Sequence, residues 1–293
     1  MIPMNCVITG ATSGIGRATA RRLAALGANL VIVVRNAGAG TDVVNDLRRL
    51  GPTAEVAFVQ ADLSNPNDVR RLAGDIGRRF PQLHVLINNA GGRFDTCRIT
   101  ADGVELTFAT NHLGHFLLTC LLYDSLVRAG GARVVTVASG SHRAANTADG
   151  WSLSCEKYDR RLAYANSKLA NVLFGYELAR RVSRTTVTSN IADPGGVATN
   201  FARNNGMVAW VRHLMAHALT RDLLSPGKAA EGIVYLATSE EVKGVNGKYF
   251  YRGRAVESSP DSQNPEAARQ LWDLSIELSG VGDRLPTSLV ARA

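Results

Sequence analysis

The chain has 293 residues, of which 45% are hydrophobic and 20% are charged. This composition excludes a disordered chain, and the length suits one large domain that needs no metal or disulfide to hold its core together. Lysine and arginine total 33 against 25 acidic residues, a formal net charge of +8. No basic run exceeds two residues and aromatic residues are only 6%, so we expect no nucleic-acid partner.

Short apolar runs alternate with longer segments of helical periodicity along the chain. Strands are expected at residues 4–9, Asn29–Val34, 55–60, 83–88, 133–138 and 186–191. Helices are expected at residues 14–26, 41–50, Pro66–Arg79, about 110–129, 162–182 and 266–279. This alternation predicts an α/β fold, a single-domain Rossmann-type doubly wound parallel β-sheet in a three-layer α/β/α arrangement.

The four cysteines are Cys6, Cys97, Cys120 and Cys155. They form no C-x-x-C pair and no framework spacing, so we expect free thiols. The N-terminus shows no signal peptide, and no run approaches the length of apolar residues that crosses a membrane. These features together predict a cytoplasmic protein without a membrane span.

A glycine-rich loop follows the first expected strand and precedes the first helix. Its candidate cofactor-binding residues are Gly10, Thr12, Ser13, Gly14, Ile15 and Gly16. Glycines permit a tight turn and close backbone approach, and the helix N-terminus offers free N–H groups to a phosphate. The G-x-x-x-G-x-G spacing differs from the commonest dinucleotide fingerprint, but its place between strand and helix favours a dinucleotide over an empty glycine turn.

The end of the second strand bears on which dinucleotide is bound. An acidic residue there would bind the ribose 2′-OH of NAD(H), whereas an arginine accommodates the 2′-phosphate of NADP(H). The chain has Arg35 at this point, and Arg17 lies just past the glycine loop. We therefore favour NADP(H) over NAD(H), the alternative being that Arg35 is one more surface arginine.

Tyr164 and Lys168 form a Y-x-x-x-K pair near the start of an expected helix. Residues four apart share a helix face, so the phenol and the ammonium can converge. A phenol is a poor base at neutral pH, and a nearby cation lowers its pKa by favouring the phenolate. The pair is therefore a candidate for acid–base chemistry.

These motifs occur in an order that resembles the short-chain dehydrogenase/reductase superfamily over nearly the full chain. The matching residues are Thr9 to Gly16, Asp62-Leu63, Asn88-Asn89-Ala90-Gly91, Asn111, Ser139, Tyr164, Lys168 and the P-G-x-V-x-T run that begins at Pro194. Within the superfamily the chain is most similar to the retinol-dehydrogenase-like branch. The signals for this branch are the runs at residues 100–103, 111–118, 167–171 and 271–275.

The resemblance implies a catalytic set of Asn111, Ser139, Tyr164 and Lys168. Tyr164 would be the general acid/base, Ser139 would orient the substrate, and Asn111 would hold a proton-relay water. Lys168 would assist Tyr164 electrostatically and bind the ribose. The same resemblance places further residues at the cofactor: Asp62 and Leu63 near the adenine, Asn89 and Ala90 beside the ribose, and Pro194, Gly195, Val197 and Thr199 around the nicotinamide.

Three departures from the family pattern limit what is carried over. Ala138-Ser139 replaces the usual Ser-Ser, which leaves the catalytic position filled. Asp193 stands before Pro194, where this branch often has His or Tyr. No extension like the membrane anchor of the animal retinol dehydrogenases precedes the first strand, so retinol is not carried over as the substrate.

The domain assignment places the catalytic, NADP-binding domain at residues 1–255, with a substrate lid at about 200–225, and a C-terminal helical appendage at 256–293. The resemblance implies that this segment acts as a lid over the substrate, and its apolar stripe then suggests a small hydrophobic alcohol or carbonyl substrate. The alternative is an ordinary amphipathic helix packed on the core. His213 and His217 are four apart but have no third ligand, so we expect no metal. A homodimer or homotetramer is compatible with the helices at 110–129 and 162–182.

The sequence therefore predicts an NADP(H)-dependent oxidoreductase that interconverts an alcohol and its aldehyde or ketone. A reductase of an activated C=C bond in the same fold is an alternative, which product analysis would separate. A dinucleotide-binding module without turnover is another, and it would bind cofactor without converting any carbonyl compound.

Overall fold

The computed structural model of the chain describes residues 4–51, 54–148, 150–151, 153–156, 158–197, 223–282, 285–286 and 289. Its strands are β1 (Asn5–Thr9), β2 (Asn29–Val34), β3 (Val56–Gln60), β4 (Val85–Asn88), β5 (Arg133–Val137), β6 (Thr188–Asp193), β7 (Tyr249–Tyr251) and β8 (Arg254–Val256). Its main helices are α1 (Gly14–Ala25), α2 (Ala37–Leu50), α3 (Pro66–Arg79), α4 (Leu106–Phe108), α5 (Gly114–Arg128), α6 (Arg160–Arg181), α8 (Pro226–Thr238) and α9 (Pro265–Ser279).

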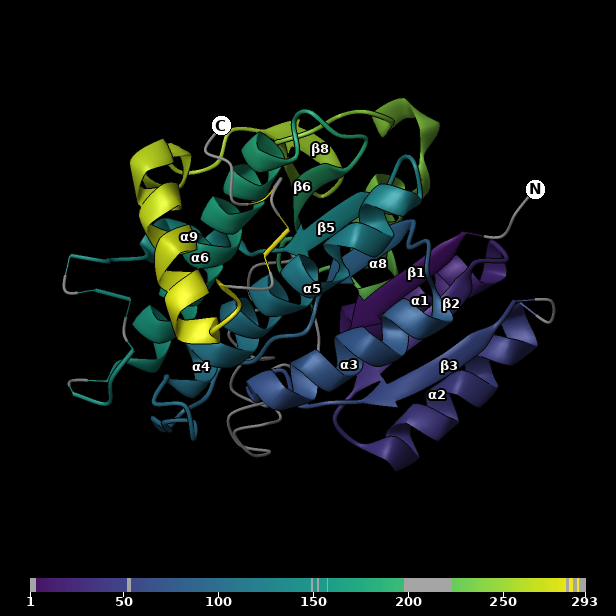
Figure 1. Cartoon of the computed structure of the whole chain (residues 1–293), viewed down its shortest axis with the longest axis horizontal. Helices are drawn as coiled ribbons and strands as arrows, with labels where there is room; N and C mark the ends of the chain where they lie inside the picture. Colours follow the sequence, from purple (N-terminus) through teal and green to yellow (C-terminus); the bar gives the residue numbers. More distant parts are fainter. Residues whose placement is uncertain are drawn as a thin grey trace.

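Among the described residues the strands form one sheet in the order β3-β2-β1-β4-β5-β6-β7-β8 (Figure 1). Every neighbouring pair is parallel except β7 and β8. The chain winds outward in both directions from the junction of β1 and β4. The predicted α/β fold with a doubly wound parallel sheet is confirmed.

Both faces of the sheet are buried because successive strand residues point to opposite sides. In β1, Cys6 and Ile8 join a core cluster with side chains of α1, α2 and α8, whereas Val7 joins a cluster with side chains of α3, α5 and α6. Each helix set therefore covers one face (Figure 1). Each fully buried apolar side chain contributes about 1.5–3 kcal/mol to this packing.

The C-terminal helix α9 packs against α5 and α6 on one of these faces (Figure 1). Its Trp272 is buried, with its ring 5.0 Å from that of Phe116 and 6.0 Å from that of Phe174. The guanidinium of Arg181 lies 4.4 Å from the Trp272 ring centroid. The appendage is thus anchored on the core, and the division of the chain at residue 255 stays a prediction.

Several element boundaries differ from expectation for local reasons. Helix α2 begins at Ala37 rather than at residue 41 because the Asn36 side chain accepts a hydrogen bond from the Ala39 N–H at 2.9 Å. Strands β7 and β8 have three residues each and were not predicted, since so short a run shows no periodicity. In the part of the chain that the structure describes, no helix is both long and apolar enough to cross a membrane.

Candidate active site

A cavity of about 740 Å³ lies at the carboxyl ends of β1, β2, β4, β5 and β6. This is the crevice where the strand order reverses, because β1 and β4 are neighbours whose following helices cover opposite faces. Most predicted site residues line it: Gly10, Thr12, Ser13, Gly14, Ile15, Gly16, Arg35, Leu63, Asn89, Ala90, Ser139, Tyr164, Lys168, Pro194, Gly195 and Val197.

The glycine loop forms the floor of the cavity where it adjoins α1. Gly10 and Gly14 have positive φ angles of 71° and 55°, which favour glycine. A Cβ at Gly16 would lie 2.3 Å from the Gly10 carbonyl oxygen, so no side chain fits there. Among the described residues, the first turn of α1 contains no acidic side chain and the N-cap Ser13 makes no side-chain cap. The backbone N–H groups in the first turn of α1 and the cavity space beside them fit the phosphates of a dinucleotide.

Asn89 fastens the end of β4 to the end of β1. Its Nδ2 donates to the Thr9 carbonyl oxygen at 2.7 Å, and Thr9 Oγ1 accepts from the N–H groups of Asn89 and Ala90, each at 2.9 Å. A ring nitrogen of His115 lies 2.8 Å from the same hydroxyl. This network holds Asn89 and Ala90 at the cavity edge where the resemblance places the ribose.

Arg35 lines the cavity just past β2 and is exposed. The other arginine considered for the phosphate, Arg17, is not among the described lining residues and instead pairs with Asp46 at 3.1 Å. Among the described residues, Arg35 is therefore the cation that lines this end of the cavity.

Asp62 and Leu63 differ in their relation to the cavity. Leu63 is buried and lines it, whereas Asp62 is exposed and is not among the described lining residues. The Asp62 carboxylate accepts hydrogen bonds from the N–H and hydroxyl of Ser64 at 2.9 and 2.7 Å. Asp62 shapes the turn after β3, and Leu63 supplies the apolar surface.

Tyr164 and Lys168 lie one turn apart on α6, as predicted, and both line the cavity with Ser139. The Lys168 ammonium donates to the Val137 carbonyl oxygen at 3.1 Å and lies 5.7 Å from the Tyr164 ring centroid. Ser139 follows β5 and hydrogen-bonds the Tyr164 phenol. A phenol, a hydroxyl and an ammonium thus meet at one point.

Burial is the largest influence on the pKa values of Tyr164 and Lys168. Burial raises the pKa of Tyr164 to about 12, although the hydrogen bond with Ser139 opposes the rise. Burial lowers the pKa of Lys168 to about 8, and the carboxylate of Asp193 opposes that fall. The lowering of the Tyr164 pKa expected from a neighbouring cation is therefore outweighed by desolvation.

Asn111 lies behind the cavity wall, in a π-helical turn, Ala109–Leu113, that precedes α5. Its Nδ2 donates to the Gly92 carbonyl oxygen and to the Ser167 hydroxyl, each at 2.9 Å, and its Oδ1 accepts from the Gly92 N–H at 2.8 Å. Such π-turns are common at functional sites. Asn111 positions the wall residue Gly92, while the proton-relay role stays a prediction.

The P-G-x-V-x-T run borders the cavity as far as Val197. Gly195 has a φ of 79°, and a Cβ there would lie 2.7 Å from Nε of Arg252. Thr199 lies outside the described residues, as does the predicted lid apart from residues 223–225. Of those, Leu223 lines the cavity.

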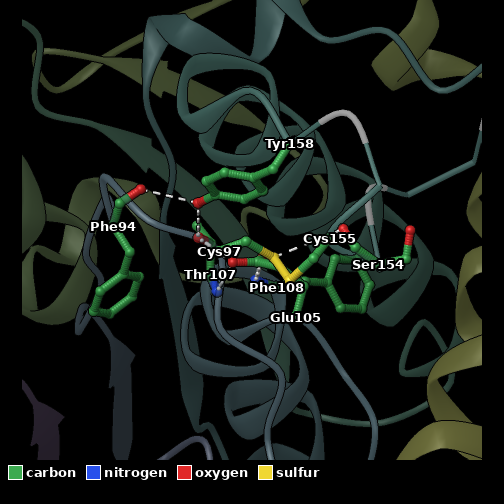
Figure 2. Close-up of a disulfide and its surroundings, with 8 residues drawn as sticks. All are labelled: Phe94, Cys97, Glu105, Thr107, Phe108, Ser154, Cys155 and Tyr158. Atoms are coloured by element: carbon green, nitrogen blue, oxygen red, sulfur yellow. Dashed lines mark hydrogen bonds between the residues drawn. A yellow bond between two sulfur atoms is a disulfide. The ribbon is translucent and has the colours of Figure 1, made fainter.

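Sequence reasoning missed the wall that Arg93 and Phe94 form after β4. This wall is tied to the segment before α6 by a disulfide between Cys97 and Cys155, and the Tyr158 hydroxyl donates to the Phe94 carbonyl oxygen at 2.9 Å (Figure 2). Tyr251 of β7 also lines the cavity, and it was missed because that strand was not predicted.

The disulfide overturns the expectation of four free thiols. That expectation is wrong for Cys97 and Cys155, while Cys6 and Cys120 are free and buried. The two bonded residues are 58 positions apart, so only the fold brings them together. Disulfides persist in oxidising environments, so the cytoplasmic expectation loses the support it drew from free thiols.

Comparison with known proteins gives concordant matches. A family model described as short chain dehydrogenase matches residues 5–207. Human retinol dehydrogenase 14 is 37% identical over 288 residues, covering 94% of this chain and 86% of that protein. Human polyprenol dehydrogenase is 38% identical over 286 residues, covering 94% of this chain and 85% of that protein.

Solved structures also match. The crystal structure of an uncharacterised protein from Mycobacterium paratuberculosis has a TM-score of 0.74 and 31% identity and covers 95% of each chain. Levodione reductase has a TM-score of 0.67 over 91% of this chain and 98% of that one. Its identity of 22% supports the fold alone.

Proposed function

Because the chain belongs to the short-chain dehydrogenase/reductase family, in its retinol-dehydrogenase-like branch, we propose that it is an NADP(H)-dependent oxidoreductase that interconverts a hydrophobic alcohol and its aldehyde or ketone. One observation carries this proposal. Tyr164, Ser139 and Lys168 converge on the same cavity that begins at the glycine loop.

In this proposal Tyr164 moves the proton. With a pKa of about 12 the phenol is protonated at neutral pH, so it can donate its proton to the oxygen of a carbonyl substrate. In the direction of alcohol oxidation the phenolate form of Tyr164 accepts the proton of the alcohol. Ser139 donates a hydrogen bond to the same substrate oxygen and orients it. The bound cofactor supplies or accepts the hydride.

Preference for NADP(H) rests on Arg35. A guanidinium binds a phosphate through charge-assisted hydrogen bonds, and no carboxylate stands at the end of β2 to bind a free ribose hydroxyl. Arg35 would hold the 2′-phosphate, the N-terminus of α1 the pyrophosphate, and Lys168 and Asn89 the ribose side.

A hydrophobic substrate suits the walls of the cavity. Phe94, Val197, Leu223 and Tyr251 supply apolar surface near the catalytic group. The relatives named for retinol and polyprenol point to long apolar alcohols as the substrate class.

The decisive experiment compares Tyr164→Phe with the parent on a panel of long-chain alcohols and aldehydes with NADP(H). We expect kcat to fall roughly 10²- to 10⁴-fold, the usual contribution of a general acid/base, while the cofactor Kd stays unchanged. Equal activity in the two proteins would rule out the acid/base role. Product analysis separates carbonyl reduction from reduction of a C=C bond, and cofactor binding without turnover on the panel would indicate a non-catalytic module.

A further inference from the structure

Asp193 places a carboxylate inside the catalytic cavity. It is the last residue of β6, it is 3% exposed, and it is the only acidic side chain among the described residues that line the cavity. A buried carboxylate costs several kcal/mol unless other groups compensate it, so its presence needs a physical reason.

The carboxylate is held in one orientation by two donors. The Tyr249 hydroxyl donates to Oδ2 at 2.6 Å, and the Gly195 N–H donates to Oδ1 at 2.9 Å. Burial, together with Asp193, raises the pKa of Tyr249 above its usual range, so this phenol stays a donor. Asp193 is thus built into the end of the sheet rather than free in the cavity.

Strand register brings Asp193 next to the catalytic residues. Val137 of β5 is opposite Ala192 of β6, so Asp193 lies beside the turn that carries Ser139. A Cβ on Gly140 would lie 3.5 Å from Asp193 Oδ2. The Lys168 ammonium is held at the same strand end by the Val137 carbonyl.

The groups that act on or face this carboxylate come from several elements. They are Tyr164 and Lys168 of α6, His142 of the turn after β5 and Tyr249 of β7, with Arg93 acting on Tyr164. The backbone N–H of Arg252, in the turn after β7, donates to the Asp193 carbonyl oxygen at 2.9 Å. The negative charge raises the pKa of Tyr164 and also that of Lys168. Both effects favour the protonated forms. At Tyr164 the effect adds to that of burial, and at Lys168 it opposes the effect of burial.

We propose that Asp193 is a positioning residue whose buried carboxylate, held by Tyr249 and Gly195 beside the turn of Ser139, adds to burial in keeping the proton on Tyr164 and opposes the effect of burial on Lys168. The site then donates a proton to a carbonyl substrate up to a higher pH than it would without this carboxylate. This inference rests on the proposed function for its catalytic consequence. It predicts that alcohol oxidation, which needs the phenolate of Tyr164, requires a more alkaline pH in the parent than in a variant without the Asp193 carboxylate.

The first test is the pH profile of kcat/KM for alcohol oxidation in the parent and in Asp193→Asn. The amide keeps the size of the side chain and can still accept from Gly195. We expect the midpoint of the alkaline rise to move down by about one pH unit, the scale of a neighbouring like charge. The matched control Tyr249→Phe removes a donor but keeps the charge, so its midpoint should not fall. Equal profiles for parent and Asp193→Asn would overturn the proposal, as would an equal fall in both variants.

A second test does not depend on turnover. Tyrosinate formation is followed by near-ultraviolet absorbance in the cofactor-free protein, and the step that disappears in Tyr164→Phe is assigned to Tyr164. We expect this step at about pH 12 in the parent, and about one unit lower in Asp193→Asn. An unmoved step in a folded variant would overturn the inference about Asp193.

The two tests separate the two proposals. If the parent converts no substrate on the panel while the tyrosinate step moves as expected, the proposed function fails and the role of Asp193 stands. If Asp193→Asn does not fold, Asp193→Ser takes its place in the same titration. If neither variant folds, Asp193 is a structural residue and the proposal is overturned.

Discussion

The two ends of the cavity are constructed in different ways. The end proposed for the cofactor is made of backbone, brought into place by Gly10, Gly14 and Gly16 between one strand and the helix that follows it. The end proposed for the substrate is made of side chains such as Phe94 and Tyr251, from segments far apart in the sequence. A single added methyl group can block a site made of backbone, whereas the shape of a site made of side chains can be changed by one substitution at a time.

The largest effect is expected at the backbone end, from Gly16→Ala. The added Cβ would lie 2.3 Å from the Gly10 oxygen and must displace the loop. We expect the Kd for NADPH, measured by fluorescence, to rise about 100-fold, which corresponds to about 2.7 kcal/mol. The matched control is Gly77→Ala in α3, where a Cβ meets nothing within 4 Å and Kd should not change. An unchanged Kd for Gly16→Ala would show that the loop does not form the cofactor floor.

A smaller and more selective effect is expected from Arg35→Ala. Losing a charge-assisted contact worth about 1.5–3 kcal/mol should weaken NADPH binding roughly 10- to 100-fold and leave NADH binding unchanged. Arg17→Ala is the control, because Arg17 pairs with Asp46 and does not line the cavity among the described residues. Equal losses for both cofactors would remove Arg35 from the 2′-phosphate site.

The smallest kinetic effect is expected at the substrate end, from the double variant Cys97→Ser/Cys155→Ser. Without the disulfide the wall at Phe94 is held by the Tyr158 hydrogen bond (Figure 2). We expect the free energy of unfolding to fall by about 2–4 kcal/mol. We also expect KM to rise a few-fold, because the wall at Phe94 moves more freely.

The disulfide variant should bind NADPH as the parent does, because neither cysteine lies in the cofactor floor. Tyr158→Phe keeps the disulfide and removes the hydrogen bond, so it should change KM less than the double variant. A lower thermal midpoint with an unaltered KM would mean that the bond stabilises the fold without shaping the substrate wall.

Local sequence signals predicted most of the regular elements, although not α8, β7 or β8. The bounds of β2 and α3 match the prediction, the first because a β-branched run lies between polar residues, the second because Asn65 caps a helix that begins with Pro66. The glycine loop, Arg35 and the Tyr164–Lys168 pair line the cavity, and the sequence could single them out because each is a contiguous run or lies one helical turn apart. Their roles stay predictions. The short strand β7 and the π-turn around Asn111 were missed because neither has a period that a window can detect.

The sequence by itself determined the α/β alternation, the glycine-rich loop between the first strand and helix, and the spacing of Tyr164 and Lys168 on one helix face, because these depend on neighbours within a few residues. Only the tertiary structure decided that Cys97 bonds Cys155, that Asn111 stands behind the wall, and that burial rather than Lys168 governs the pKa of Tyr164. It also decided that Asp193 lies against Tyr249 inside the cavity. Such contacts join residues distant in the chain, and desolvation depends on everything packed around a group, so neither can be derived from local spacing.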